Sequence, residues 1–500
     1  MRTTSTASGR SGSAVPGRRD RRPVPRRRPD APHRRPAPRT GGVWRGPLAP
    51  AAWPSLTGRQ RLTYLAVLLT GTIWLMVPRL YGAFTAHVHK EDGEIFLHGS
   101  LTGASLLERY TGYLHVVPRL ISNACAQGSA EAYPVCVASA SASLRLLLAL
   151  LVIVVVTPCT RAWWAPLACG ALALFGGVGQ QEVLGNLTNL RWFLVVGATF
   201  ALLGALRRPG HVLLGVLFVT GAALTDPLAF ALAPVALGRL AALSGRQRLV
   251  PAAMLLALML HGALIDTTAR SSSLLDSLRD DPTGLAGTVV VRGPAEAALG
   301  ESVSQALTNL LGTGVFSVLV LVGYALVLLV LLPGAPAQTR WLVALLLAAG
   351  TAFLAATVNF ADLSTILPSQ GLANASRYAL IPSLTIGPAL VLLADRAGPG
   401  RLARAVSGGL VLVMALGCVA DSRGDEWATR GPSWPETLTQ ARRTCQEEGV
   451  TTVTVPLTPQ GVPTPWTAVL TCRWVQGHQD AAGSAAPGPG QYPTRPLPTP

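Results

Sequence analysis

Charged side chains are scarce in this 500-residue chain: 13% of its residues are Asp, Glu, Lys or Arg, whereas 50% are hydrophobic. Lysine occurs once, at Lys90, and the mean hydropathy is +0.41. A soluble protein of this length cannot hide so much apolar surface. The composition therefore excludes a string of soluble domains and predicts an all-α polytopic membrane protein.

The N-terminal 61 residues lack any apolar stretch, so they hold no secretory signal peptide. They carry fifteen of the arginines against two acids, Asp20 and Asp30, and most of the net charge of +17 lies there. The basic balance therefore describes a tail and does not imply a nucleic-acid partner. We expect a disordered cytoplasmic segment at 1–61, which either lies on anionic lipid headgroups or only fixes topology.

Two motif classes are missing as well. No G-x-x-x-x-G-K-[ST] loop occurs, which disfavours ATP-driven transport, and no cysteine spacing suggests zinc. Of seven cysteines, four fall at or near the expected outer side, where oxidation can occur. We predict a disulfide between Cys445 and Cys472, while a Cys125–Cys136 bridge stays open because Cys136 could already lie inside the membrane.

Long apolar runs are abundant. A helix that crosses about 30 Å of hydrocarbon needs about 20 apolar residues. With the N-terminus inside, arginines gather in every loop on the cytoplasmic side, as the positive-inside rule requires. We therefore place the chain in the plasma membrane with its C-terminus outside. The eleven candidate spans are 62–83, 134–157, 162–179, 192–206, 211–225, 227–243, 249–266, 310–332, 340–358, 378–395 and 404–420.

The chain changes character after the last span. Residues 421–477 are polar and predict a short helix followed by two strands of β-branched residues. We expect a small extracytoplasmic α+β appendage there. Gly, Pro and Ala dominate 478–500, which predicts disorder.

The first outer loop, 84–133, holds the most informative residues. Glu91, Asp92 and Glu94 are three acids within four residues. Adjacent carboxylates repel, so one could serve as a base, or the group could hold a divalent cation such as Mg²⁺ or Mn²⁺. A solvated acidic loop is the alternative. Amphipathic helices should follow, and the candidate binding residues beyond them are Tyr113, His115 and Arg119.

A second polar cluster lies between the third and fourth spans. Its candidates are Glu182, Asn186 and Arg191, and Arg377 begins the tenth span at the same outer face. Guanidinium groups suit a lipid phosphate, although helix capping and interfacial anchoring would explain the same residues. The long outer segment 267–306 has little apolar periodicity, so we expect a linker there, with a lid as the alternative.

Taken together, Glu91-Asp92-Gly93 just after the first span and the YTGYLHVVPRL segment resemble the GT-C superfamily of integral-membrane glycosyltransferases. The resemblance covers roughly 62–475. It implies a GT-C-like bundle of residues 62–420, Asp92 as catalytic carboxylate with Glu91 as its partner, and Glu182 as an assisting acid. It also implies a polyprenyl-phosphate-linked sugar as donor and a cell-envelope glycan or lipid as acceptor, used outside the cell, with a metal in some members.

Two other classes remain open from the sequence. A transporter or flippase of lipid-linked glycans would want polar groups near mid-membrane, whereas the polar clusters here gather at the outer face. A non-catalytic envelope assembly protein would use the basic tail and the outer appendage as docking sites.

Overall fold

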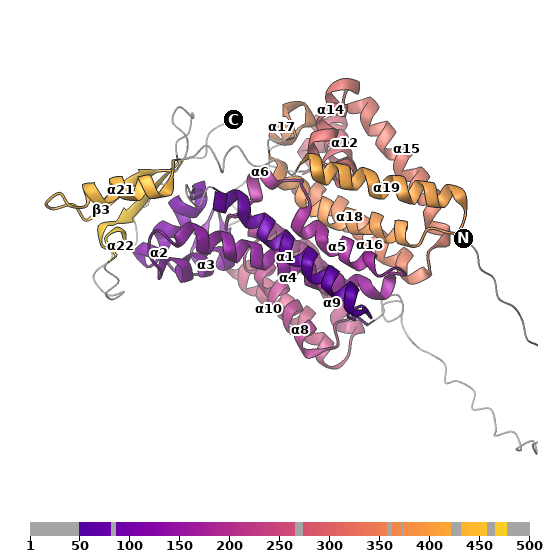
Figure 1. The fold of residues 1–500 in the computed structure, drawn as a ribbon, viewed down its shortest axis with the longest axis horizontal. Helices are drawn as coiled ribbons and strands as arrows, with labels where there is room; N and C mark the ends of the chain where they lie inside the picture. Colours follow the sequence, from indigo (N-terminus) through magenta and orange to yellow (C-terminus); the bar gives the residue numbers. More distant parts are fainter. Residues whose placement is uncertain are drawn as a thin grey trace, which may run out of the picture. The chain divides into compact units, whose positions relative to one another are not determined.

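Helices dominate the computed structural model of the chain, which describes residues 50–81, 87–265, 274–357, 363–372, 375–421, 432–457 and 466–477 (Figure 1). Most of the expected basic tail and all of 478–500 lie outside the described residues.

Each of the eleven apolar ranges contains a helix. These apolar runs form helices because a helix satisfies its own backbone N–H and C=O groups where no water can do so. The helices are α1 (Gly58–Tyr81), α4 (Tyr133–Val156), α5 (Trp164–Phe175), α7 (Leu190–Leu203), α8 (Pro209–Ala223), α9 (Ala233–Ala242), α10 (Leu249–Leu264), α15 (Thr313–Leu331), α16 (Ala337–Thr357), α18 (Leu380–Asp395) and α19 (Arg401–Ala420).

Six helical segments of the described residues are long and apolar enough to cross a membrane, which supports a multi-pass membrane protein. The regions of α5, α7, α8 and α9 are apolar but shorter, at 10 to 17 residues. The six longer segments are Tyr133–Cys159, Gly245–Leu264, Thr313–Gly334, Ala337–Thr357, Ser376–Asp395 and Arg401–Ala420.

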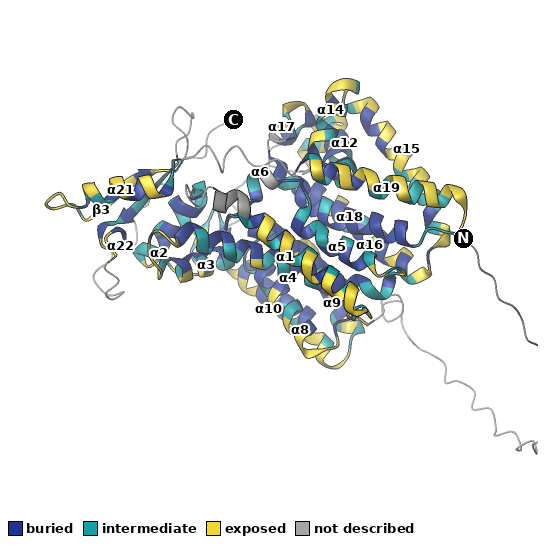
Figure 2. Cartoon of the chain, in the orientation of Figure 1, coloured by how far each residue is buried: buried dark blue, intermediate teal, exposed yellow. Residues whose placement is uncertain are grey.

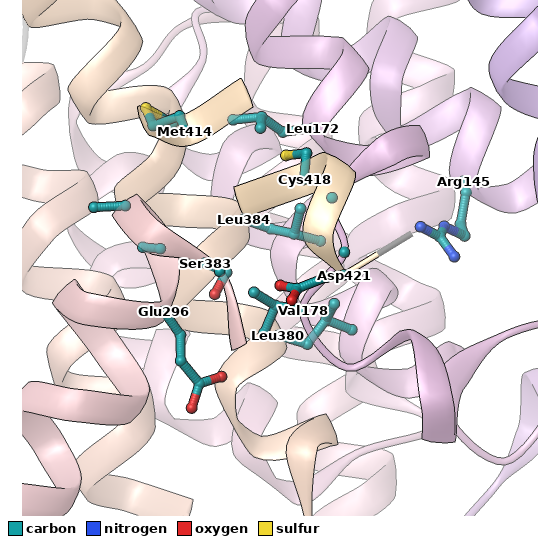
Figure 3. Close-up of a pocket in the computed structure, with 15 residues that line it drawn as sticks. Arg145, Leu172, Val178, Glu296, Leu380, Ser383, Leu384, Met414, Cys418 and Asp421 are labelled. Carbon is teal, nitrogen blue, oxygen red and sulfur yellow. The ribbon is translucent and has the colours of Figure 1, made fainter. Parts of the chain in front are cut away.

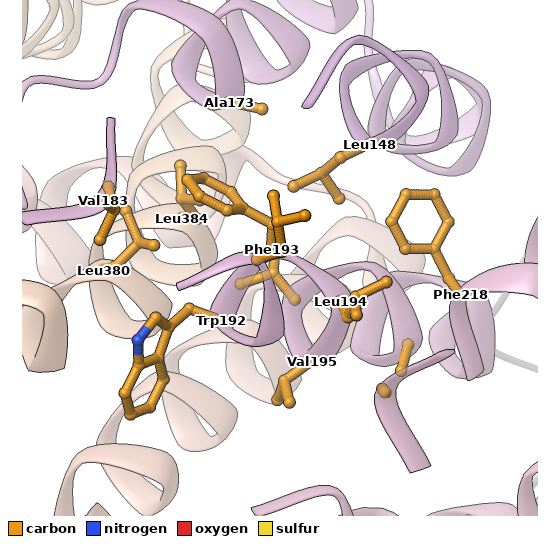
Figure 4. Packing of buried hydrophobic residues seen from close by; sticks show 14 of the residues in the cluster. Leu148, Ala173, Val183, Trp192, Phe193, Leu194, Val195, Phe218, Leu380 and Leu384 are labelled. Carbon is orange, nitrogen blue, oxygen red and sulfur yellow. The ribbon is translucent and has the colours of Figure 1, made fainter. Parts of the chain in front are cut away.

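Helix α18 lies at the centre of the packing. Apart from Ser383, all of its residues are buried, against α5, α7 and α16 among others. Figure 4 shows Trp192 and Phe193 of α7 beside Leu384 of α18 in this core. Helices α7 and α8 approach so closely that a Cβ on Gly197 would collide with the Phe218 ring. This close packing of α7, α8 and α18 therefore fixes the positions of the loops that connect to these helices.

Helices α15 and α19 have the opposite environment. Figure 2 shows α18 largely buried and α15 and α19 largely exposed. The exposed side chains are apolar, for example Leu319 and Leu326 on α15 and Leu416 on α19. Apolar surface of this extent on helices of spanning length suits contact with lipid.

The segment between α1 and α4, called the first outer loop after its predicted side, is built from short elements in its described part. A π-helix, η1 (Asp92–Leu97), continues into α2 (His98–Thr102), and α3 (Val116–Ala126) ends the loop. Between them, β1 (Arg109–Tyr110) and β2 (Tyr113–Leu114) form a hairpin around Thr111-Gly112, where both residues have positive φ. A disulfide joins Cys125 to Cys136, so the bridge that the sequence left open is present.

The C-terminal segment has the expected mixed character. Helix α21 (Trp434–Thr444) precedes the antiparallel pair β3 (Thr452–Pro456) and β4 (Thr467–Thr471), and the short α22 (Cys472–Val475) follows. The predicted Cys445–Cys472 disulfide is confirmed, and it joins the end of α21 to the end of β4.

The expectation of a linker at 267–306 is wrong for the part that the structure describes. Four helices fill it. Two caps contribute to them. Asp281 is a local cap that accepts the Gly284 N–H at 2.8 Å to begin α12, whereas Asp421, 120 residues away in sequence, accepts the Glu301 N–H at 2.6 Å to begin α14. The helices are α11 (Leu274–Asp280), α12 (Pro282–Val290), α13 (Glu296–Leu299) and α14 (Glu301–Leu311), with the π-helix η6 (Val291–Ala295) between α12 and α13.

Candidate functional site

Asp92 ties the first outer loop to the second. Its side chain is 1% exposed, and its carboxylate accepts the N–H groups of Leu187 at 2.8 Å and Thr188 at 3.1 Å, and the Thr188 hydroxyl at 3.0 Å. Burial raises the pKa of this carboxyl, although the charge of His89 and the two N–H donors oppose the rise. Three donors already occupy Asp92, so its present role is to join the loops.

Glu91 is the more accessible of the two neighbouring acids, with 23% of its side chain exposed. Its Oε2 lies 3.2 Å from Nε2 of His89. Burial raises the pKa of Glu91, but the hydrogen bond and charge of His89 outweigh it and bring the pKa to about 2. Arg377 also stabilises this carboxylate electrostatically. Glu91 is therefore ionised at neutral pH, and its negative charge interacts with the positive charge of Arg377.

The third acid of the cluster points elsewhere. Glu94 accepts the Thr467 N–H of β4 at 3.3 Å, and a Cβ on Gly93 would come within 2.5 Å of Leu457 Cδ1. Glycine at position 93 therefore lets Leu457 of the C-terminal segment approach the backbone closely. Among the described residues, no three His, Cys, Asp or Glu side chains converge on a metal-sized space. The acids thus do not form the divalent-cation site that their spacing suggested.

Glu182 and Arg377 pair across 195 residues of sequence. Arg377 Nη1 donates to Glu182 Oε1 at 2.6 Å, and its backbone N–H donates to Oε2 at 2.9 Å. Asn186 is fully buried beneath this pair, where its amide nitrogen donates to the Glu182 carbonyl at 2.6 Å. Glu182 lies on the short helix α6 (Gln180–Val183), and Asn186 lies in the loop that follows it. The Asn186 amide is used to hold this loop in place.

Arg191 lies in a small pocket with aromatic walls. Its guanidinium donates to the Tyr113 hydroxyl, its Nε is 3.5 Å from Asp226 Oδ2, and its centre is 4.6 Å from the Trp192 ring. Tyr378 lines the same pocket. Asp226, which precedes Pro227 at a turn, suggests from its sequence position a helix cap, with a ligand role as the alternative. It caps through the Leu228 N–H at 2.8 Å, and its second oxygen belongs to the pocket. An acid between two apolar spans was the signal for it.

His115 and Arg119 lie behind this pocket. His115 is fully buried, its ring stacks on Tyr113 at 4.5 Å, and neither ring nitrogen meets a hydrogen-bond partner among the described residues. Burial, helped by the charge of Arg191, holds the pKa of His115 well below its usual range, so the ring is neutral. Arg119 is also buried and donates to the Glu108 carbonyl at 3.1 Å. Both residues support the loop.

The site residues thus fall into two connected groups. Glu91, Glu182 and Arg377 form one, and Tyr113 and Arg191 form the other; the charges of Arg191 and Arg377 act on each other, and Tyr378 follows Arg377 into the pocket of Arg191. Comparison of the chain with protein-family models, curated proteins and solved structures finds no match. The geometry of the site therefore carries the functional argument by itself.

Proposed function

We propose that the chain is a GT-C-type glycosyltransferase that moves a sugar from a polyprenyl-phosphate donor to a cell-envelope glycan or lipid. The observation that carries this proposal is that Arg377, whose charge acts on the accessible carboxylate of Glu91, directly precedes Tyr378 of the aromatic pocket that holds Arg191. An acid and a phosphate-binding pair are the groups that such a transfer requires.

In the proposed reaction the acceptor oxygen attacks the anomeric carbon of the donor sugar while the bond from that carbon to the phosphate oxygen breaks. The acceptor proton passes to a carboxylate, and polyprenyl phosphate leaves with the bonding electrons. Glu91 is the accessible base, whereas Asp92 could act only after releasing Leu187 or Thr188. Arg377 and Arg191 would stabilise the charge on the departing phosphate. No step is assigned to a metal ion, since the described acids do not group around one.

The membrane arrangement belongs to the same proposal. We infer eleven spans, with α1 (Gly58–Tyr81) and the four shorter α5, α7, α8 and α9 regions crossing as well as the six long segments. The flanking loops alternate in arginine content, as this arrangement requires. An odd number places the N-terminus in the cytoplasm and the candidate site and C-terminal segment outside, in the plasma membrane.

The test is release of polyprenyl phosphate from a panel of labelled polyprenyl-phosphate sugars by the purified chain in lipid. Wild type should turn over at least one donor. Glu91→Gln should lower the rate about 100-fold or more, because the amide cannot accept the proton. Glu448→Gln, at an exposed acid of the C-terminal segment, is the matched control and should keep full turnover.

Other outcomes assign other functions. Turnover that survives Glu91→Gln but fails in Asp92→Asn moves the base to Asp92, and survival of both variants moves it to Glu182. Tight donor binding without turnover of any donor contradicts the enzyme and supports the flippase. Neither binding nor turnover supports the assembly protein.

A further inference from the structure

Glu296, at the start of α13, is a buried carboxylate without a hydrogen-bond donor. Its side chain is 1% exposed, and neither Oε1 nor Oε2 meets a partner among the described residues. Arg292 Nη1 lies 4.0 Å from Oε1, but this guanidinium donates to the carbonyls of Ile366 at 2.6 Å and Leu372 at 3.1 Å. A carboxylate buried without donors is costly unless positive charge meets it.

The neighbouring charges increase this cost. Glu301 and Asp421 both act on Glu296, so three carboxylates surround the single guanidinium of Arg292. Asp421 is occupied by the N–H groups of Glu301 and Ser302, and Glu301 Oε2 lies 3.5 Å from the Gly179 nitrogen. Burial, with the charges of Glu301 and Asp421, holds the pKa of Glu296 well above its usual range although Arg292 opposes it.

A cavity adjoins the free oxygens. It measures about 30 Å³, enough for one or two water-sized groups, and most of its remaining lining is apolar. Figure 3 shows Glu296 and Ser383 on one side of the cavity and Arg145 on the other. The Ser383 hydroxyl is buried and also lacks a partner among the described residues. Arg145 donates to the Ala173 carbonyl at 2.8 Å and rests on the Phe193 ring.

We propose that this cavity binds one small positive charge, a sodium ion or a proton, on the carboxylate of Glu296 with the Ser383 hydroxyl as a second oxygen. One charge suits the site because three carboxylates, those of Glu296, Glu301 and Asp421, are balanced by only two guanidinium groups, Arg292 and, across the cavity, Arg145. A divalent ion does not suit it, since no three acidic or imidazole groups of the described residues surround one point.

The site lies next to the candidate active site but does not depend on it. Gly176, Gly177 and Val178 line the cavity, and the same segment continues through Gly179 to Glu182. Bound charge at Glu296 would thus support the loop that also holds Asp92 and Arg377. The inference is independent of the proposed transferase activity and needs no substrate to test.

The experiment measures the thermal unfolding midpoint of the full chain in lipid between pH 5.5 and 8.5. Sodium chloride is compared with N-methyl-D-glucamine chloride at equal ionic strength. A sodium site raises the wild-type midpoint by about 3 °C or more in sodium. A proton site raises it by a similar amount as the pH falls, equally in both salts. Glu296→Gln should remove the sodium response, or the part of the pH response that Glu301 does not supply, and the exposed control Glu448→Gln should keep the full response.

A second variant covers the case in which Glu296→Gln does not fold. Ser383→Ala leaves the carboxylate in place and removes one oxygen, so it should raise the half-saturating sodium concentration about 5-fold, or lower the pH at which the midpoint changes. Equal responses to sodium and pH in wild type, Glu296→Gln and Ser383→Ala would overturn the proposal.

Discussion

Asp92 illustrates how a residue's burial changes its interpretation. The motif predicts a catalytic carboxylate, but the structure gives both of its oxygens to Leu187 and Thr188. A carboxylate that accepts three hydrogen bonds in a buried place stabilises the joined loops. Glu91, one residue earlier, keeps the exposure that proton transfer to a substrate needs.

Replacing Asp92 by Asn should therefore lower stability as well as any activity. The amide nitrogen of Asn would face a backbone N–H of Leu187 or Thr188, and one donor would lose its acceptor. We expect a loss on the order of 2 kcal/mol in the free energy of unfolding. Thermal unfolding in detergent measures it, with Glu91→Gln as the partner-matched comparison. Equal unfolding midpoints for the two variants would contradict the role of Asp92 in holding the two loops together.

Glu301 makes stability depend on pH. Burial and the charge of Asp421 raise its pKa to about 7. The folded state thus holds the proton more tightly than the unfolded state, so the contribution is present below pH 4.5 and is lost as the pH rises through about 7.

Glu301→Gln should remove this dependence. The stability of wild type relative to the variant should fall by on the order of 3 kcal/mol between pH 4.5 and pH 7.5. Unfolding midpoints of both proteins across that range measure the difference. Parallel curves of midpoint against pH for the two proteins would show that the pKa of Glu301 is not raised in the folded state.

Among the elements, the C-terminal strand pair is the one that covers the acidic motif. Glu94 binds the Thr467 N–H, His98 Nδ1 lies 3.3 Å from the Val469 carbonyl, and Leu457 occupies the space above Gly93. The indole N–H groups of Trp434 and Trp474 donate to carbonyls of Ala130 and Ala126 at 2.8 and 2.9 Å. The appendage is consequently part of the wall of the first outer loop.

Gly93→Ala should loosen this contact. The added Cβ would lie 2.5 Å from Leu457 Cδ1, and overpacking of this kind typically costs about 1–3 kcal/mol. Protease cleavage within the C-terminal segment should become faster. The double variant Gly93→Ala/Leu457→Ala should restore resistance to the protease toward that of Leu457→Ala alone. If it does not, contact with Leu457 is not the reason that position 93 requires glycine.

Sequence patterns located the helices better than the contacts between them. The run predicted at 134–157 is α4 at Tyr133–Val156, because a long apolar stretch interrupted by one charged residue, Arg145, is recognisable from sequence alone. The helices of 274–311 were missed because their residues have little apolar periodicity, and the start of α14 is capped by the distant Asp421, which no local pattern reveals. No local pattern links Glu182 to Arg377 or Asp92 to Leu187, because these contacts depend on how the helices pack.

For the whole molecule, the exposed apolar helices define where lipid must lie. Leu326, on α15, has 56% of its surface exposed. Leu326→Arg should therefore reduce membrane insertion, because arginine at the centre of a span costs about 2.5–3.5 kcal/mol. The membrane-integrated fraction after carbonate extraction measures it. Gln440→Arg, on an exposed face of α21, should insert as wild type does; equal insertion of both variants would remove α15 from the lipid boundary.

The proposed topology makes a separate prediction for the two ends. Alkaline phosphatase fused after Gly477 should be active in cells, because that enzyme folds only outside the cytoplasm. The same reporter joined after Arg61 should be inactive. Equal reporter activity at both positions would show that the number of crossings is even, and activity at Arg61 alone would reverse the orientation.

The long-range ties have a consequence for biosynthesis. Membrane helices emerge from the ribosome in order, yet α14 is capped by Asp421, and η1 is covered by Leu457 and β4. The first outer loop therefore stays uncovered until the residues that cover it, Leu457 and β4, have been translated near the end of the polypeptide. A nascent chain that stops before Leu457 would leave Gly93 and its acidic neighbours uncovered and therefore open to proteases.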